Sequence, residues 1–262
     1  MPHSQRTLHD VRERGVRSST TTLVGAASAS VAIVLLSTAA RYGFHRDELY
    51  FMANAESPAW GYVDHPPLTP MVGWVSQQLF GDSVFGLRVI PALVGAGIVA
   101  LTAAISREVG GDGRAQVLAA WAAATTVVVL AVSHMLTTPT LDVLVWTAAL
   151  WVLCRIVRTA DIRWFLLLGV ICGIGLMNKL TFVFAPAAFG LGLLATPQRR
   201  LLSNRWAATG AGLALVIAAP HLWWQVDRGW PILELGSAIA DEATENRLLM
   251  VPLQLLFLGL PI

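Results

Sequence analysis

The sequence predicts an all-α, polytopic membrane protein with about seven or eight transmembrane helices. Of its 262 residues, 55% are hydrophobic and only 13% are charged, and the mean hydropathy is +0.63. An average soluble domain carries roughly 25% charged residues. Uncharged stretches about as long as a bilayer crossing recur along the chain, and the arginines gather in the intervals on one side of them. The net charge of +2 is too small to suggest nucleic acid as a partner.

The first span is predicted at residues 21–40, after a basic tail at 1–20. A basic flank before a first span favours a cytoplasmic N-terminus in a multi-pass protein of the cell membrane. A cleaved signal peptide is the alternative, because Ser37, Thr38 and Ala39 resemble a small-residue cleavage site. The further spans that follow at once favour an anchored helix.

Further crossings follow from the preference of basic intervals for the inner side of the membrane. Where both flanks of an apolar stretch are basic, the chain must cross an even number of times. The stretch at 164–195 is too long for one span and suits two short ones that turn at Asn178 and Lys179. The predicted spans after the first are 84–105, 115–132, 140–154, two within 164–195, and 207–224.

This layout places twelve arginines inside and six cations outside. The outer cations are Arg41, Arg46, Arg88, Lys179, Arg228 and Arg247. Residues 21–262 are then one transmembrane domain behind the tail at 1–20, with a large first outer loop at 41–84. Because the final segment 251–262 is too short to cross, we expect the chain to be an N-terminal part of a longer protein.

The outer loop contains most of the residues suited to chemistry near a membrane. Asp47 and Glu48 can open a short helix, since carboxylates in a first turn complement the helix dipole. Pro66 and Pro67 suit the start of a second, amphipathic helix that lies in the interface and ends at Gly81.

Each candidate residue also has a plainer interpretation. Asp47 and Glu48 could hold a general base and its neighbour, or could only cap a helix. Asp64 and His65 precede a rigid diproline that fixes their side chains, although the same residues could form a simple turn. Asp142 near the start of a span could be a dipole partner, and Lys179 could be a snorkelling lysine or a cation facing a lipid phosphate.

The order of short motifs resembles the protein-mannosyltransferase-like GT-C membrane glycosyltransferases. This superfamily includes the protein O-mannosyltransferases (family 39) and the bacterial aminoarabinose transferases. The resemblance covers nearly all of residues 20–250 and rests on FHRDELYF, GYVDHPPL, LFGDSVFGLR, TPTLD and NKLTF. It implies a polyprenyl-phosphate-linked sugar donor, and transfer to a protein, lipid or glycan acceptor on the outer face.

The resemblance also implies roles for individual residues. It makes Asp47 the first-loop acid and Glu48 its neighbour, both catalytic. Asp142, Lys179, His65 and Arg88 are implied to bind substrate, and Asp64 is the acid before the diproline. His65 departs from the family, because aminoarabinose transferases tend to have lysine there.

These roles combine into an inverting single displacement. Asp47 is expected to deprotonate the acceptor hydroxyl, while Lys179, with His65 or a divalent metal ion near Asp64, offsets charge on the departing phosphate. A membrane transporter or lipid flippase is the main alternative, but it would need acids or a polar path within the spans. An inactive scaffold fragment is the third.

Overall fold

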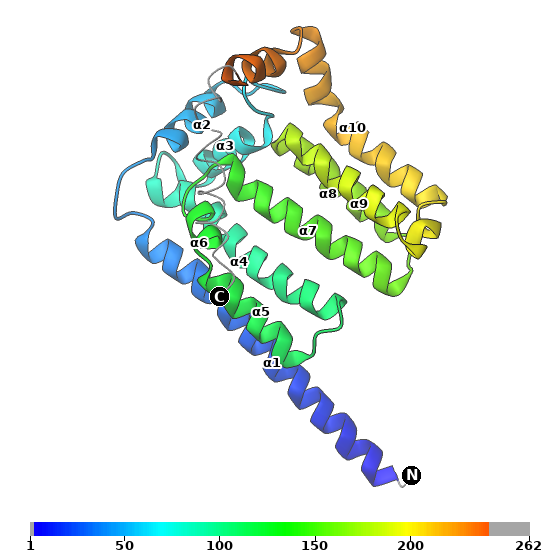
Figure 1. Cartoon of the computed structure of the whole chain (residues 1–262). Coiled ribbons are helices and arrows are strands. Elements are labelled where there is room, and N and C mark those ends of the chain that lie inside the picture. The colour runs from blue at the N-terminus through cyan, green and yellow to red at the C-terminus, as the bar shows by residue number, and fades with distance from the viewer. Residues whose placement is uncertain (1–2, 241–262) are drawn as a thin grey trace.

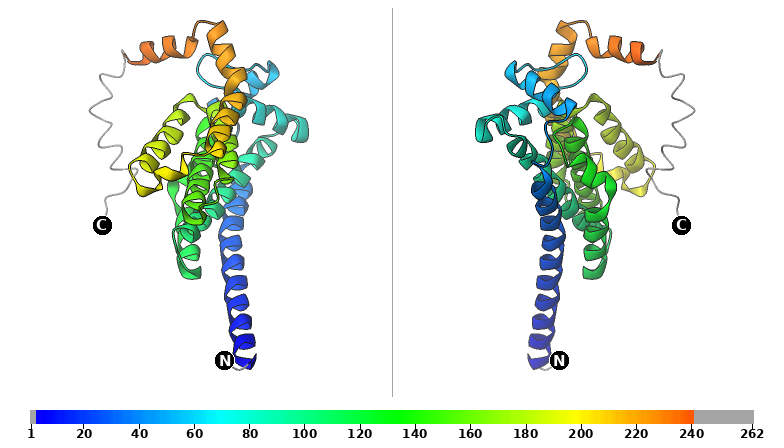
Figure 2. Two further views of the ribbon diagram at one scale, coloured as in Figure 1. Left: turned by 90° about the vertical axis from the view of Figure 1, so that its right-hand side faces the viewer. Right: turned by 90° about the vertical axis from the view of Figure 1, so that its left-hand side faces the viewer.

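The computed structural model describes residues 3–240, with side chains from residue 18 onward, and in this part of the chain every regular element is a helix. The helices lie side by side in a bundle, with α2 and α3 across one end and the start of α1 extending beyond the other (Figures 1 and 2). The all-α prediction is confirmed. The helices are α1 (His3–Thr38), α2 (Arg46–Glu56), α3 (Leu68–Phe80), α4 (Val84–Glu108), α5 (Gly113–Thr125), α6 (Val127–Val132), α7 (Thr138–Thr159), α8 (Trp164–Asn178), η1 (Leu180–Val183), α9 (Phe184–Leu194), η2 (Pro197–Leu201) and α10 (Arg205–Asp227), followed by a helical segment at Pro231–Ala240.

Four of the described helices are long and apolar enough to cross a membrane: Ser18–Thr38 of α1, α4, α7 and α10. The chain is therefore an integral membrane protein by the length and composition of its helices. The other predicted crossings coincide with shorter helices, α8 with 15 residues and α9 with 11, so the total of seven or eight remains a prediction. The predicted segment 251–262 lies outside the described residues.

The predicted span at 115–132 is interrupted. Thr126 adopts extended backbone angles, φ −70° and ψ 127°, between α5 and α6. Its hydroxyl donates a 2.7 Å hydrogen bond back to the carbonyl of Ala122. A β-branched residue that competes for a helix carbonyl in this way weakens the turn that it belongs to.

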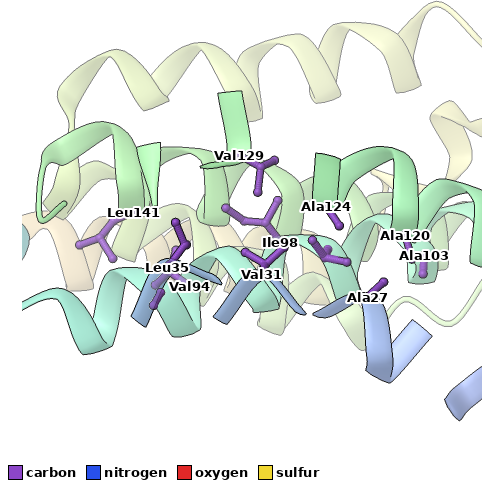
Figure 3. Packing of buried hydrophobic residues seen from close by; sticks show 12 residues of the cluster. Ala27, Val31, Leu35, Val94, Ile98, Ala103, Ala120, Ala124, Val129 and Leu141 are labelled. Atoms are coloured by element: carbon purple, nitrogen blue, oxygen red, sulfur yellow. The ribbon is translucent and has the colours of Figure 1, made fainter. Parts of the chain in front are cut away.

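The first packed core lies where α1 crosses α4 and α5. Val31, Ile98 and Ala124 are among its buried side chains (Figure 3). Alanines at the contacts allow these helices to approach closely, and in lipid such packing, rather than expulsion of water, holds helices together.

A second core joins α7, α8 and α10, and α8 touches α10 through backbone. A Cβ atom added to Gly169 would lie 2.1 Å from the carbonyl oxygen of Gly210, and one added to Gly210 would lie 2.2 Å from that of Phe165. No side chain fits at either glycine without separating the helices. The crossing fixes α8, whose last residue is Asn178, against α10.

The predicted helix signals of the outer loop are confirmed. His45 caps α2 by accepting a hydrogen bond from the Asp47 amide, with Glu48 completing a capping box. α3 begins directly after the diproline and ends at Gly81, whose φ of +64° favours glycine. Ser83 then caps α4 by accepting from the Gly86 amide at 3.2 Å.

Candidate functional site

A buried ion pair fixes the outer loop to the bundle. Glu48 and Arg88 have side chains that are 0% and 1% exposed. The Arg88 Nε and Nη2 atoms donate to the two Glu48 carboxylate oxygens at 2.9 and 2.6 Å, and its other donors reach the carbonyls of Ala39 and Gly43. The Arg88 guanidinium also lies 4.0 Å from the ring centre of Tyr42. The pair thus ties the start of α2, the end of α1 and the first turn of α4 together.

Glu48 is placed differently from its predicted catalytic role, and Arg88 from its predicted substrate-binding role. Glu48 also accepts from the backbone amide of His45 at 2.8 Å, so both of its oxygens are engaged inside the protein. Its carboxylate is bound bidentately by a guanidinium, and its side chain has no exposed surface. Both residues therefore position α2 and do not offer free groups to a ligand.

Asp47, one residue away, points to open space. Its side chain is 42% exposed and accepts a 3.2 Å hydrogen bond from Arg46, while the His45 ring lies 3.9 Å away. It lines a cavity of about 480 Å³ between α2 and the segment that leads from α6 into α7. Tyr50, Asp64, Met135 and Thr138 line the same cavity. The two predicted acids, Asp47 and Asp64, are therefore brought together at one opening.

Asp64 is held by a tyrosine from α2. The Tyr50 hydroxyl donates a 2.7 Å hydrogen bond to Asp64 Oδ1. Partial burial, and then the neighbouring Asp64 carboxylate, raise the pKa of Tyr50 above its usual value. Tyr50 thus stays protonated and donates a hydrogen bond to Asp64. The Asp64 side chain remains 41% exposed.

His65 is buried beneath this acid. Its Nδ1 lies 2.8 Å from the carbonyl oxygen of Pro66, and its Nε2 lies 3.2 Å from the side-chain amide nitrogen of Asn54. A carbonyl partner requires Nδ1 to carry a proton, and Nε2 also lies 3.7 Å from the Asp64 carboxylate. The rings of Tyr50, Phe51 and Tyr62 surround it. Both ring nitrogens are used within the loop, which argues against the predicted phosphate contact.

Asn178 joins three elements beside the cavity. It is fully buried, accepts from the Thr69 hydroxyl of α3 at 2.9 Å, and donates to the carbonyl of Thr138 at the start of α7 at 3.0 Å. Thr138 itself lines the cavity of Asp47. The sequence indicated only a turn at Asn178; its place in NKLTF was the signal that could have drawn attention to it.

Lys179 follows at once and is exposed. It is close enough to Asp142, one turn into α7, for their charges to interact. Asp142 Oδ1 is buried without a hydrogen-bond partner among the described residues. The structure thus places the predicted lysine within electrostatic range of the second predicted acid. Asn178 anchors the backbone beside the lysine to the start of α7, which borders the cavity.

The residues around Asp64 do not form a recognisable metal site. Within residues 3–240, no group of three or more histidine, cysteine, aspartate or glutamate side chains is arranged to hold a metal ion. Asp64 is bonded to Tyr50, and the adjacent imidazole is committed to the loop. The residues present do not fit the predicted divalent ion.

Sequence comparisons place this geometry in a family. The dolichyl-phosphate-mannose-protein mannosyltransferase family matches residues 64–224, which is more than half of the chain. Among individual proteins, "Putative mannosyltransferase YkcB" of Bacillus subtilis (strain 168) is 25% identical over 189 residues, 71% of this chain. The chain spans about a quarter of the length of that relative. No solved structure matches this chain. The matched region runs from Asp64 through the cavity segment, Asp142 and Lys179 into α10, and the chain belongs to the dolichyl-phosphate-mannose-protein mannosyltransferase family.

Proposed function

We propose that this protein transfers a sugar, in the first place mannose, from a polyprenyl-phosphate donor to a hydroxyl group on a protein, lipid or glycan acceptor. The observation that carries the proposal is the open cavity lined by Asp47 and Asp64. Membership of the mannosyltransferase family supports the donor class. The reaction takes place on the outer face of the membrane, the side that the arginine distribution assigns to the loop at 41–84.

Asp47 acts as the general base. Its carboxylate is exposed to the cavity, while the pair of Glu48 and Arg88 holds the first turn of α2 in place. The acceptor hydroxyl gives its proton to Asp47 as its oxygen attacks the anomeric carbon from the side opposite the phosphate. The bond from this carbon to the phosphate oxygen breaks, and its electron pair leaves with the polyprenyl phosphate. The configuration at the carbon inverts.

Lys179 offsets the charge that develops on the leaving phosphate. Its ammonium group is exposed beside Asp142, and Asn178 fixes its backbone relative to the cavity. A cation positioned before the reaction lowers the barrier without reorganisation at the moment of bond breaking. Asp64, oriented by Tyr50, is left to accept hydrogen bonds from sugar hydroxyls.

The donor lipid also needs a surface for its prenyl tail. An apolar cavity of about 340 Å³ lies between α8, α9 and α10, and Phe165, Leu168, Val183, Phe189 and Ala214 are among its lining residues. Its lining includes Leu176 and Val183, which stand on either side of the turn at Asn178 and Lys179. A tail held there leaves the phosphate close to the lysine.

Transfer by the purified chain tests the proposal. The full chain in lipid nanodiscs is mixed with radiolabelled polyprenyl-phosphate mannose and a solubilised envelope fraction as the source of acceptors. We expect label in a protein, lipid or glycan product whose linkage is inverted relative to the donor. Tight donor binding with no labelled product would overturn the enzymatic assignment, and a retained linkage would overturn single displacement.

A further inference from the structure

A second charged cluster lies at the other end of α4. Glu108, the last residue of that helix, is twenty residues from Arg88, roughly 30 Å along the axis. Its side chain has no exposed surface and accepts from Arg107 at 3.4 Å, from Arg155 at 2.8 Å and from Arg158. One carboxylate thus gathers three guanidinium groups from α4 and α7.

The cluster borders a cavity of about 620 Å³ that lies beside the middle of α1, between the end of α4, the start of α5 and the end of α7. All three arginines line it, together with Thr20, Gly113 and Gln116. This cavity is larger than the one that Asp47 lines, and none of its residues belongs to the proposed transferase site. It lies beside the N-terminal end of the apolar stretch that begins at Ser18.

Among the described side chains, the positive charge at this cavity exceeds the negative charge. Three guanidinium groups face one carboxylate, which accepts from one nitrogen of each. A guanidinium has five N–H donors, so most donors in the cluster have no carboxylate partner among the described residues. The Nε of Arg155 is buried with no hydrogen-bond partner among the described residues. Arg155 cannot turn freely, because its guanidinium lies 4.7 Å from the ring centre of Trp164.

We propose that this cavity binds a phosphate ester, and specifically the headgroup phosphate of an anionic phospholipid in the leaflet opposite the transferase site. Planar guanidinium groups bind phosphate oxygens through paired hydrogen bonds. Basic cavities between membrane helices at headgroup depth suit anionic lipid headgroups. Trp164 marks that depth, since tryptophan is enriched at the membrane interface.

The chain offers two variants that change the cavity with little effect on the ion cluster. Arg107 makes the longest contact with Glu108 and its side chain is 53% exposed, so Arg107→Gln removes a cation at small structural cost. Gln116 lines the cavity and donates to the carbonyl of Gly111, and Gln116→Glu adds an anion there. Arg163→Gln is the matched control, because Arg163 is exposed and near Trp164 in sequence but does not line the cavity.

Native mass spectrometry of the full chain, titrated with short-chain phosphatidylglycerol, phosphatidylcholine or inorganic phosphate, tests the proposal. We expect phosphatidylglycerol to bind at least fivefold more tightly than phosphatidylcholine, and each cavity variant to lose about fivefold or more, since one basic residue contributes about that factor at a lipid surface. Arg163→Gln should bind like the wild type.

The remaining outcomes are equally decisive. Binding of inorganic phosphate as tight as that of phosphatidylglycerol, and sensitive to Arg107→Gln, would assign the cavity to a soluble phosphate ester and overturn the lipid. Equal affinity for both phospholipids, or equal losses in Arg107→Gln and Arg163→Gln, would overturn the site. Thermal midpoints of the lipid-free variants within a few degrees of the wild type show that folding does not account for the losses.

Discussion

Each end of α4 carries a cluster in which arginine meets a glutamate with no exposed surface, and the two clusters differ in how their charges are matched. At the start of the helix, Arg88 and Glu48 bond to one another and to neighbouring carbonyls, and their side chains are 1% and 0% exposed. At its end, Glu108 meets three arginines beside a large cavity. A matched buried pair holds elements in place, whereas surplus charge beside open space is available to a ligand.

The comparison is sharpened first by asking which side of the membrane each end faces. A cysteine at exposed Ser57, in the outer loop, should be labelled by an impermeant thiol reagent in intact cells. One at exposed Ser203, just before α10, should be labelled only after lysis. The two native cysteines lie within helices and serve as the background measurement. External labelling of Ser203→Cys would reverse the assignment of both clusters.

The closed cluster should show the largest effect on stability. Arg88→Met leaves the buried Glu48 carboxylate without its cationic partner, which is expected to cost about 3–5 kcal/mol. Replacing both residues, as Glu48→Met with Arg88→Met, should recover much of that loss because no charge is left unpaired. Unfolding in mixed detergent micelles measures both. A single variant as stable as the wild type would mean that the pair does not fix the loop.

The acid next to the closed pair should show the largest effect on turnover. Asp47→Asn keeps the shape of the side chain but removes its basicity, and general-base catalysis contributes about 10²–10⁴-fold. We therefore expect transfer to fall by about 10²-fold or more with donor binding unchanged. Glu56→Gln, at an exposed acid on the same helix, is the control. Near-normal turnover of Asp47→Asn would show that Asp47 is not the general base and only helps to begin α2.

Lys179 gives an intermediate case, a single cation beside a single acid. If it contacts the donor phosphate, Lys179→Gln should weaken donor affinity or slow transfer by about tenfold or more, since hydrogen bonds to charged groups contribute about 1.5–3 kcal/mol. Lys179→Arg should retain much of both. Donor titrations and turnover that are the same for Lys179→Gln and the wild type would instead indicate a lysine that only reaches to the membrane surface.

The smallest effect is expected at the open cluster. Arg107→Gln removes one contact that is 3.4 Å long and half exposed, so it should change stability by less than about 1 kcal/mol. The same unfolding measurement used for Arg88→Met checks this. A loss as large as that of Arg88→Met would show that the two clusters are alike and that charge surplus does not distinguish them.

The helices and their ends were largely predictable because their signals are local. Hydropathy located the long helices, and the diproline and Gly81 begin and end α3 at the positions that the sequence indicated. The cap that His45 supplies to α2 was found only in the structure. Asp47 and Asp64 were selected as candidates from one loop, but the cavity that they share also needs the segment between α6 and α7, which the sequence did not place there. The break at Thr126 was missed, because the residues on both sides of it are apolar and uncharged and hydropathy does not distinguish them.

Contacts between distant parts of the chain were not predictable from one sequence. Glu48 and Arg88 are 40 residues apart, and Thr69 and Asn178 are 109 apart. Both charged residues of the first pair were selected as candidates, but only the fold shows that they neutralise one another. The cluster of Glu108 was missed for the same reason, because its arginines looked like separate marks of the inner side of the membrane.

The backbone contact between α8 and α10 bears on how distant members of this family can be recognised. Leucine, valine and phenylalanine can replace one another on most of these helix faces. Sequence divergence between relatives therefore leaves few identical positions to align there. Gly169 and Gly210 have no such freedom, since each would place a Cβ atom within about 2 Å of a carbonyl oxygen. Two glycines about forty positions apart, the first nine residues before an Asn-Lys turn, are therefore a better search pattern for this pair of helices than its hydrophobicity.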